Sequence, residues 1–195
     1  SFMNEIANLC EAYNADIDEV RRGMCADRRI GNQFLYPGLG YGGSCFPKDV
    51  LACIAMGETS NTPVELLTSV HEVNQKQRQA FIAKIDNYFQ KSLTGKRIAI
   101  WGIAFKPGTD DIREAPSITL MKHLLDHGAQ VVAYDPVAHE PCRKVPGVGE
   151  RVLFVHDALN ALADADALVI CTDWDEFRHP EFDDFKRLMK HPVIF

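Results

Sequence analysis

Apolar residues recur at helical spacing through the first half of the chain. Residues 2–13 and 16–27 each carry an apolar stripe that repeats every three to four positions, which predicts two amphipathic helices. A third helix is expected to begin at Phe46-Pro47, because proline suits the first turn of a helix. A long polar helix is then predicted up to about residue 93, and its length indicates that it connects domains or lies along a partner.

The pattern changes after residue 94 to short apolar runs that alternate with helical segments. The predicted strands span residues 97–102, 130–134, 152–155, 167–171 and 192–195, and the predicted helices between them span residues 117–127, 159–163 and 182–189. Such alternation predicts parallel β-α-β units. The expected fold is therefore α/β: an all-helical domain with a long connecting helix (1–93), followed by a Rossmann-like, doubly wound parallel sheet (94–195) that is incomplete at its C-terminus.

Composition and charge narrow the class of protein. The 195 residues contain 21 Lys and Arg against 27 Asp and Glu, a net charge of −6, and are 46% hydrophobic, which is typical of a globular domain. No basic stripe favours nucleic acid and no apolar run is long enough to span a membrane. Six cysteines without a C-x-x-C pair, and no signal peptide, indicate a cytoplasmic protein with free thiols. The histidines do not cluster at metal-ligand spacing, so no metal site is expected.

Both ends of the chain look cut. The first helix is already in progress at Phe2, and the last predicted strand stops without a turn. We therefore expect the chain to be a fragment of a longer protein.

Residues 38–43 (GLGYGG) satisfy the G-x-G-x-x-G expression of dinucleotide-binding loops. That interpretation needs a strand immediately before the motif, but Pro37 precedes it and Ser44-Cys45 follow before any helix. The better interpretation is a loop whose main-chain NH groups approach an anion or a sugar.

Cys45 is the sharpest single candidate. It lies just before the Pro47 helix start, where free NH groups and the helix dipole favour a thiolate, and Lys48 is expected to lower its pKa further. A thiolate there could attack a carbonyl carbon and hold the product, with Asp49 as a neighbouring carboxylate. A small buried hydrophobe is the alternative. We expect that inert role for the other five cysteines, Cys53 among them.

A second candidate is the loop of residues 105–114 (FKPGTDDIRE), at the carboxyl end of the first strand. Ligands bind at such ends in α/β folds, and Lys106 and Arg113 could hold phosphates. A solvated loop with local ion pairs is the alternative. Asp135, at the end of the second strand, could contact a ribose hydroxyl, although Asp before Pro is more often only a turn.

Three segments resemble, in the same order, motifs of the UDP-glucose/GDP-mannose dehydrogenase family. They are residues 4–11 (NEIANLCE), residues 34–49 (FLYPGLGYGGSCFPKD) and residues 102–113. The second closely resembles the active-site segment of bacterial members that act on UDP-glucose, and the resemblance covers essentially the whole chain. The FLYP run favours UDP-glucose over GDP-mannose or UDP-N-acetylmannosamine.

The resemblance implies an NAD-dependent oxidation of UDP-glucose to UDP-glucuronate. The family oxidises the C6 alcohol to a carboxylate with two NAD⁺ and releases no aldehyde, which requires a covalent holder. By resemblance Cys45 is that nucleophile and Asp49 assists with water and protons. The resemblance implies that the substrate is contacted by Phe34, Leu35, Tyr36, Pro37, Gly38, Gly42 and Lys106. It implies that Arg29 reaches the substrate site of a neighbouring subunit. Lys48 and Arg113 would contact NAD. Arg29 would thus make the helical domain the core of a homodimer.

The chain departs from the family pattern in two places. Nothing in it corresponds to the family's N-terminal NAD-binding domain or to the catalytic lysine and asparagine that precede the first helix. Gly38 stands where bacterial members commonly have Ser, which is expected to loosen one phosphate contact. We therefore expect the chain to fold, dimerise and bind UDP-sugar weakly without turnover. The alternatives are a non-catalytic UDP-sugar-binding or dimerisation module, and a redox-sensing thiol protein, for which no resolving cysteine lies near Cys45.

Overall fold

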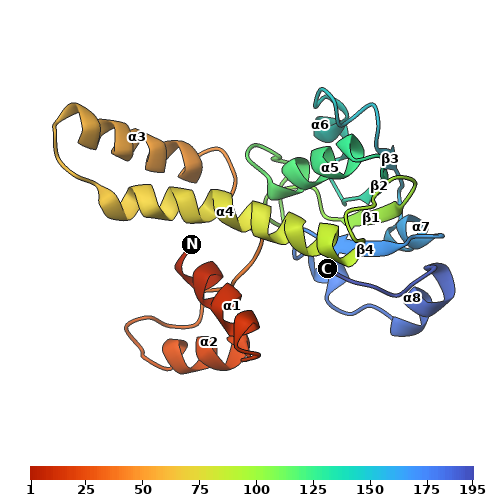
Figure 1. Cartoon of the computed structure of the whole chain (residues 1–195), viewed down its shortest axis with the longest axis horizontal. Helices are drawn as coiled ribbons and strands as arrows, with labels where there is room; N and C mark the ends of the chain where they lie inside the picture. The colour runs from red at the N-terminus through yellow and green to blue at the C-terminus, as the bar shows by residue number, and fades with distance from the viewer.

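A computed structural model describes all 195 residues, Ser1–Phe195, and has a helical part and a part built on a sheet (Figure 1). The helices are α1 (Phe2–Ala12), α2 (Ile17–Cys25), α3 (Phe46–Thr59), α4 (Glu65–Tyr88), α5 (Pro116–Asp126), α6 (His139–Arg143), α7 (Ala158–Leu162), the short 3₁₀-helix η1 (Asp175–Phe177) and α8 (Phe182–Leu188). The strands are β1 (Arg97–Trp101), β2 (Gln130–Tyr134), β3 (Leu153–Phe154) and β4 (Ala167–Ile170).

The helical part is organised around α4. Helix α3 runs back along the first half of α4 and forms with it the α3–α4 hairpin, which projects away from the rest of the chain (Figure 1). Helix α1 packs on α4 from another side, and α2 follows it as an outer arm. Helix α4 ends at Tyr88 rather than near residue 93, because Gln90 and Lys91 adopt left-handed φ values of 51° and 61° that a helix cannot continue through.

The sheet is parallel throughout, with strand order β3-β2-β1-β4. The chain runs from β1 outward to β3 and then returns to place β4 on the other side of β1. The order therefore reverses between β1 and β4, and the carboxyl ends of these two strands form the switch point at which such sheets bind ligands. The doubly wound parallel sheet predicted from the sequence is confirmed.

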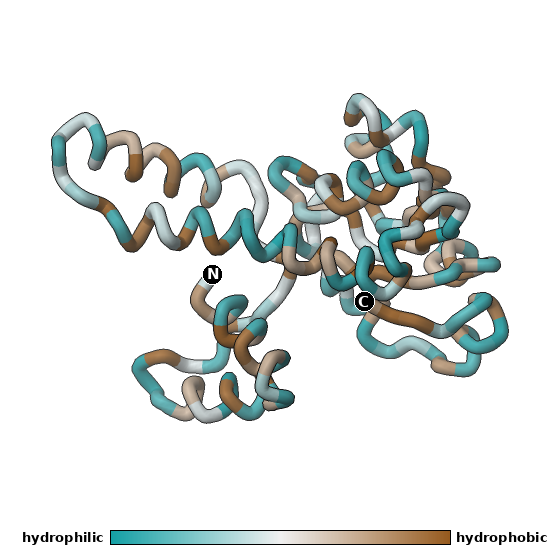
Figure 2. The backbone as a smooth tube through the Cα atoms, viewed as in Figure 1, coloured by the Kyte–Doolittle hydropathy of each residue, from teal (hydrophilic) through white to brown (hydrophobic).

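Alternate residues of β1 serve two different cores. Ile98 and Ile100 belong to a cluster that includes residues of α4 and α5, whereas Ala99 and Trp101 pack with residues of α7 and α8 on the opposite face. Since successive side chains of a strand point to opposite faces, helices on both sides are needed to bury such a continuously apolar strand. Figure 2 shows brown, apolar segments in the sheet part as well as along the helices of the helical part.

The structure differs from the sequence prediction in three details. Helix α6 was not expected, and only Leu168 and Ile194 form a bridge where a full terminal strand was predicted. Cys53, expected to be buried, is exposed, because α3 contacts α4 on one side only. None of the eight helices combines the length and the hydrophobicity that crossing a membrane requires.

Candidate active site

Cys45 lies where an irregular segment turns into a helix. Residues 32–45, here called the thiol loop, form no helix or strand, and no strand precedes the glycine motif, which excludes the dinucleotide-fingerprint interpretation. Cys45 occupies the N-cap position of α3, with Pro47 in the first turn, and its side chain is exposed. The thiol is therefore open to solvent at the N-terminus of a 14-residue helix, where a reactant can reach it.

Two cations lie near this thiol. Lys48 Nζ donates to Asp49 Oδ1 at 2.6 Å, and the hydrogen bond with Asp49 raises the pKa of Lys48, to which Cys45 adds a further charge contribution. The pKa of Arg113 is raised chiefly by its hydrogen bonds to Asp111, with Cys45 again a smaller contributor. The two sequence-predicted clusters therefore meet: Lys48 and Asp49 come from α3, while Arg113 comes from the other domain.

Residues 105–114, here called the cation loop, are in direct contact with the thiol loop. The backbone NH of Gly43 donates to the carbonyl of Arg113 at 2.8 Å. A Cβ at Gly42 would overlap the carbonyl of Glu114, and a Cβ at Gly43 would lie 2.8 Å from the Phe105 ring. Only glycine lets the two backbones come this close. Gly42 and Gly43 of the motif thus serve the contact between the two loops.

Side chains of α1 and α4 hold the thiol loop from behind, and sequence reasoning missed them. Asn74 accepts from the NH of Tyr41 at 2.7 Å and donates to its carbonyl at 3.1 Å. Gln77 donates to the carbonyl of Gly38, whose NH donates to Asn4. All of these polar side chains are buried. The signal in the sequence is their spacing, since Asn74, Gln77 and Arg78 share one face of α4 where an apolar stripe would otherwise lie.

Arg78 ties the two loops to each other. Its guanidinium donates to the carbonyl of Tyr41 at 3.1 Å and to the carbonyl of Glu114 at 2.9 Å, and a Glu114 carboxylate oxygen lies 3.4 Å away. Only 7% of the Arg78 side chain is exposed. A buried guanidinium that donates to both loops fixes their relative position.

Of the residues expected to line a substrate site, Gly42 is buried against the cation loop, whereas the segment of residues 34–38 is partly or fully open to solvent. Phe34 and Tyr36 are among the most exposed large apolar residues of the chain, and the Tyr36 ring lies under the Arg21 guanidinium at 3.6 Å. Leu35 adopts a left-handed φ of 68°, an unusual conformation for a branched side chain and a common sign of a ligand-binding segment. Pro37 is partly buried, and Gly38 is exposed, with nothing within 4 Å of a Cβ built on it.

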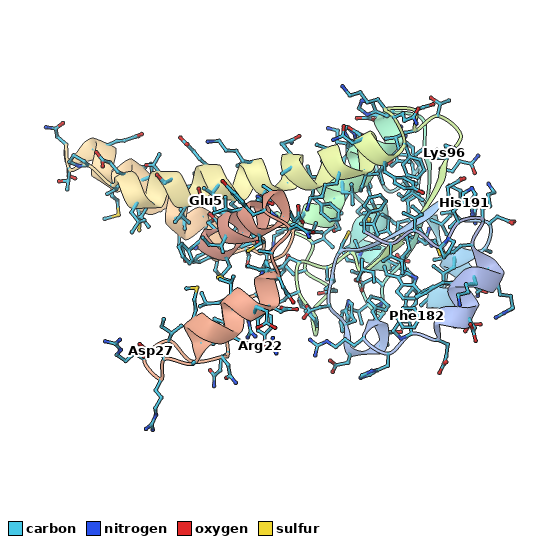
Figure 3. All side chains as sticks on the ribbon, turned by 60° about the horizontal axis from the view of Figure 1, so that its bottom comes forward. Glu5, Arg22, Asp27, Lys96, Phe182 and His191 are labelled. Atoms are coloured by element: carbon cyan, nitrogen blue, oxygen red, sulfur yellow. The ribbon has the colours of Figure 1, made fainter.

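Lys106 and Arg29 are also exposed, but they lie in different places. Lys106 extends from the cation loop, with Nζ 5.3 Å from the centre of the Phe105 ring, which rests on Gly43. Arg29 pairs with Asp27, and Asp27 lies at the outer end of the α2 arm, away from the sheet part (Figure 3). The fold of one chain therefore joins Lys106 to the thiol loop but leaves Arg29 outside the cluster.

Asp135 has a structural role instead of a ligand-binding one. It is 1% exposed, and one carboxylate oxygen accepts from the NH groups of Ile103 and Ala104 while the other accepts from Val137 and Ala138. The turn interpretation is therefore correct. Asp135 thus holds the start of the loop that follows β1 against the turn that follows β2. No group of His, Cys, Asp and Glu residues could hold a metal ion.

Comparison with known proteins places the chain among nucleotide-sugar dehydrogenases. The sequence profile of the UDP-glucose/GDP-mannose dehydrogenase family, central domain, matches residues 1–76, and the profile of that family's UDP binding domain matches residues 99–195. The UDP-glucose 6-dehydrogenases of Pseudomonas aeruginosa and Bacillus subtilis (TuaD) are 45% and 41% identical to the chain over its whole length. The chain spans 44% and 41% of those two proteins.

Solved structures give the same result. The UDP-glucose dehydrogenase of Pyrobaculum islandicum is similar over 99% of the chain and 46% of its own, with a TM-score of 0.87 and 30% identity. The UDP-N-acetyl-mannosamine dehydrogenase Cap5O of Staphylococcus aureus covers all of the chain and 41% of its own, with a TM-score of 0.72 and 26% identity. Two successive domain profiles and the shared fold establish that the chain belongs to the UDP-glucose/GDP-mannose dehydrogenase family.

Proposed function

We propose that the chain supplies the thiol and the sugar-nucleotide site of an NAD-dependent UDP-glucose 6-dehydrogenase. The observation that carries the proposal is the exposed Cys45 at the start of α3, with Lys48 beside it and the cation loop held against it from the other domain. An apolar, exposed segment at Phe34–Tyr36 and the free Lys106 offer complementary contacts for a uridine ring and its phosphates.

Cys45 acts on the aldehyde stage of the reaction. Loss of a hydride and a proton from the C6 alcohol leaves an aldehyde, and the Cys45 thiolate adds to its carbon while the oxygen takes a proton. Loss of a second hydride and proton from this thiohemiacetal gives a thioester. Water then attacks the carbonyl, the C–S bond breaks, and the carboxylate and the Cys45 thiolate are released. The four electrons leave as two hydrides, so that two equivalents of NAD⁺ are consumed.

Asp49 handles protons in this scheme. It lies one turn after Cys45 on α3 and holds Lys48 in a 2.6 Å contact, which keeps a carboxylate and a cation beside the thiol. A carboxylate there can accept a proton from the attacking water. Lys48, in turn, stabilises negative charge that develops near sulfur and on the substrate oxygen.

The cofactor would be held at the same face. Lys48 and Arg113 are exposed cations near Cys45, and they fit the phosphates of NAD, although each now pairs with a carboxylate. When bound, NAD⁺ supplies the hydride acceptor.

We also propose a homodimer that forms through the helical domain. Exposed apolar side chains lie along α1 and the α3–α4 hairpin: Phe2, Leu9, Tyr13, Leu51, Met56 and Leu66. Such side chains are typical of surfaces that are covered in an assembly. Arg29 on the α2 arm pairs with its neighbour Asp27 but is 89% exposed, and it would reach a second copy. All six cysteines are unpaired, which supports a reducing, cytoplasmic location.

Calorimetric titration of UDP-glucose tests the substrate site. We expect the parent chain to bind, and Lys106→Ala to weaken binding by about 10-fold through loss of a charge-assisted contact. Lys122→Ala, an exposed lysine of α5, is the matched control and should leave affinity unchanged. Cys45→Ala should also bind UDP-glucose nearly as the parent does. Equal affinities of the two lysine variants, or tighter binding of GDP-mannose, would contradict the assignment.

The same sample tests the role of the thiol. Cys45 and Cys53 are both exposed and lie two turns apart on α3, whereas burial raises the pKa of Cys142 and Cys171 to about 12. We expect UDP-glucose to slow alkylation of Cys45 by iodoacetamide and to leave Cys53 unaffected, as read by peptide mass spectrometry. If UDP-glucose protected both thiols equally, or neither of them, Cys45 would not lie in the substrate site.

A further inference from the structure

The first part of the thiol loop, residues 32–36, is not held by backbone hydrogen bonds. Its NH groups donate none to another backbone group, and its carbonyls accept none from one. Farther along the same loop, buried side chains of α1 and α4 bind the backbone of Gly38 and Tyr41. The conformation of residues 32–36 therefore depends on a different set of side-chain contacts.

Arg21 of helix α2 makes these contacts. Its Nη2 donates to the carbonyl of Asn32 at 2.7 Å and, more weakly, to the carbonyl of Phe34 at 3.4 Å. Its Cζ lies 3.6 Å from the centre of the Tyr36 ring, which is the geometry of a cation–π interaction. No other side chain forms a hydrogen bond with the backbone of residues 32–36. One guanidinium thus contacts three of the five residues.

The contacts of Arg21 lie on both sides of a strained residue. Leu35 adopts a left-handed φ of 68°, a conformation that is unfavourable for a residue with a Cβ. Phe34, whose carbonyl accepts from Arg21, precedes it, and Tyr36, whose ring lies under the guanidinium, follows it. A left-handed residue other than glycine persists only where its surroundings hold it in place. At Leu35 the group that does so is Arg21.

We propose that Arg21 is a positioning residue of the sugar-nucleotide site, which holds residues 34–36 in their binding conformation before the ligand arrives. This rests on the proposed function, in which the same segment contacts the uridine. Phe34 is 75% and Tyr36 68% exposed, so both side chains stay open to a ligand while the backbone between them is fixed. A segment that is already ordered loses less conformational entropy on binding. Arg21 acts through this segment and needs no contact with the substrate.

Limited proteolysis without ligand tests whether Arg21 holds the segment. Chymotrypsin cleaves after Phe34, and the rate in the folded chain follows the population in which the segment has opened. We expect Arg21→Met, which keeps an unbranched stem and removes the charge, to speed this cleavage by at least about 5-fold, as read by mass spectrometry. Arg22→Met is the matched control, because Arg22 is the next residue of α2 (Figure 3) and pairs only with Glu19. It should be cleaved as the parent is.

Calorimetric titration of UDP-glucose tests whether the held conformation serves the ligand. We expect Arg21→Met to weaken binding by about 5-fold and Arg22→Met to leave it unchanged. Arg21→Lys keeps a charge over the Tyr36 ring and should recover part of the lost affinity. Lys106→Ala, which removes a proposed direct contact, should weaken binding without speeding cleavage after Phe34. Only a positioning residue changes both quantities and is rescued by the conservative variant.

Three results would overturn the proposal. They are equal cleavage rates of Arg21→Met and Arg22→Met, faster cleavage of Arg21→Met with unchanged affinity for UDP-glucose, and a lysine variant that binds no better than the methionine variant. A parent chain that does not bind UDP-glucose at all would refute the proposed function and the positioning role together. The cleavage rates need no ligand, so they show separately whether Arg21 holds the segment.

Discussion

The glycines of the thiol loop differ in what surrounds them. Nothing lies within 4 Å of a Cβ built on Gly38, and its φ is not in the left-handed region, so a side chain is tolerated there. A Cβ on Gly42, in contrast, would overlap the backbone carbonyl of Glu114. Backbone cannot move aside as a flexible side chain can, and the two positions should therefore respond differently to the same substitution.

We expect Gly38→Ser to change the free energy of unfolding by less than about 0.5 kcal/mol and to tighten UDP-glucose binding, because a hydroxyl is gained beside the proposed phosphate contacts. Gly42→Ser should destabilise the chain by about 1–3 kcal/mol and weaken binding, because the two loops must separate. Urea unfolding and calorimetry measure both quantities. Similar losses of stability in the two variants would show that the loop contact is not what Gly42 serves.

At the residue scale, the sequence predicted the thiol and not its support. The Pro47 helix start predicted Cys45 at the N-terminus of a helix, but a buried side chain remained an alternative until the structure showed the thiol to be exposed. The prediction that Cys53 is buried was wrong, because no other helix or strand packs over the face of α3 that carries it. The hydrogen bonds of Asn74, Gln77 and Arg78 are made to backbone groups more than 30 positions away in the sequence. No local pattern of residues could have predicted these partners.

Helices and strands could be predicted where the repeat of apolar residues along the sequence was long enough to recognise. Strand β2 lies where the apolar run predicted it, since its three central residues are buried and pack into cores on both faces of the sheet. Helix α6 has only five residues, and Pro141 lies among them. A helix this short shows no repeat of apolar positions, and a proline in the sequence argues against a helix, so α6 was not predicted. The end of α4 was also misplaced, because no glycine marks the left-handed residues that terminate it.

Asp135 provides a test of how the elements at the switch point are joined. Asp135→Ala removes the acceptor of four backbone NH groups and of Trp174 Nε1, and leaves buried donors unpaired. We expect the free energy of unfolding to fall by at least about 3 kcal/mol in urea titration. Asp157→Ala removes a solvent-exposed cap that accepts two NH groups at the start of α7, and should cost only about 1 kcal/mol. Equal losses would refute the special role of burial at Asp135.

At the scale of the whole molecule, the helical domain is the less self-sufficient half. Most of the buried apolar residues lie in the two clusters around the sheet, whereas Leu51, Met56 and Leu66 of the α3–α4 hairpin are exposed. A hairpin of two helices with exposed apolar side chains gains stability when a second surface covers it. This is the physical basis of the proposed dimer.

We expect the chain to sediment as a dimer, and Leu66→Glu to weaken self-association by at least about 10-fold, because a carboxylate would have to be desolvated in the interface. Leu66 is 77% exposed in the single chain and lies in the first turn of α4. Val137→Glu, at a 50% exposed position of the sheet domain, is the control and should remain dimeric. Analytical ultracentrifugation separates the outcomes. A parent chain that stays monomeric at about 100 μM would exclude a stable dimer.

The contact between the two loops also constrains how such a protein can diverge over generations. Gly42 and Gly43 belong to the domain that carries the thiol, while Phe105 and Glu114 belong to the domain that carries the sheet. A larger residue at either glycine requires a compensating change across the boundary. Recombination that exchanged one domain between distant relatives would pair a thiol loop and a cation loop that do not fit each other. Selection therefore favours inheritance of the two domains as one unit.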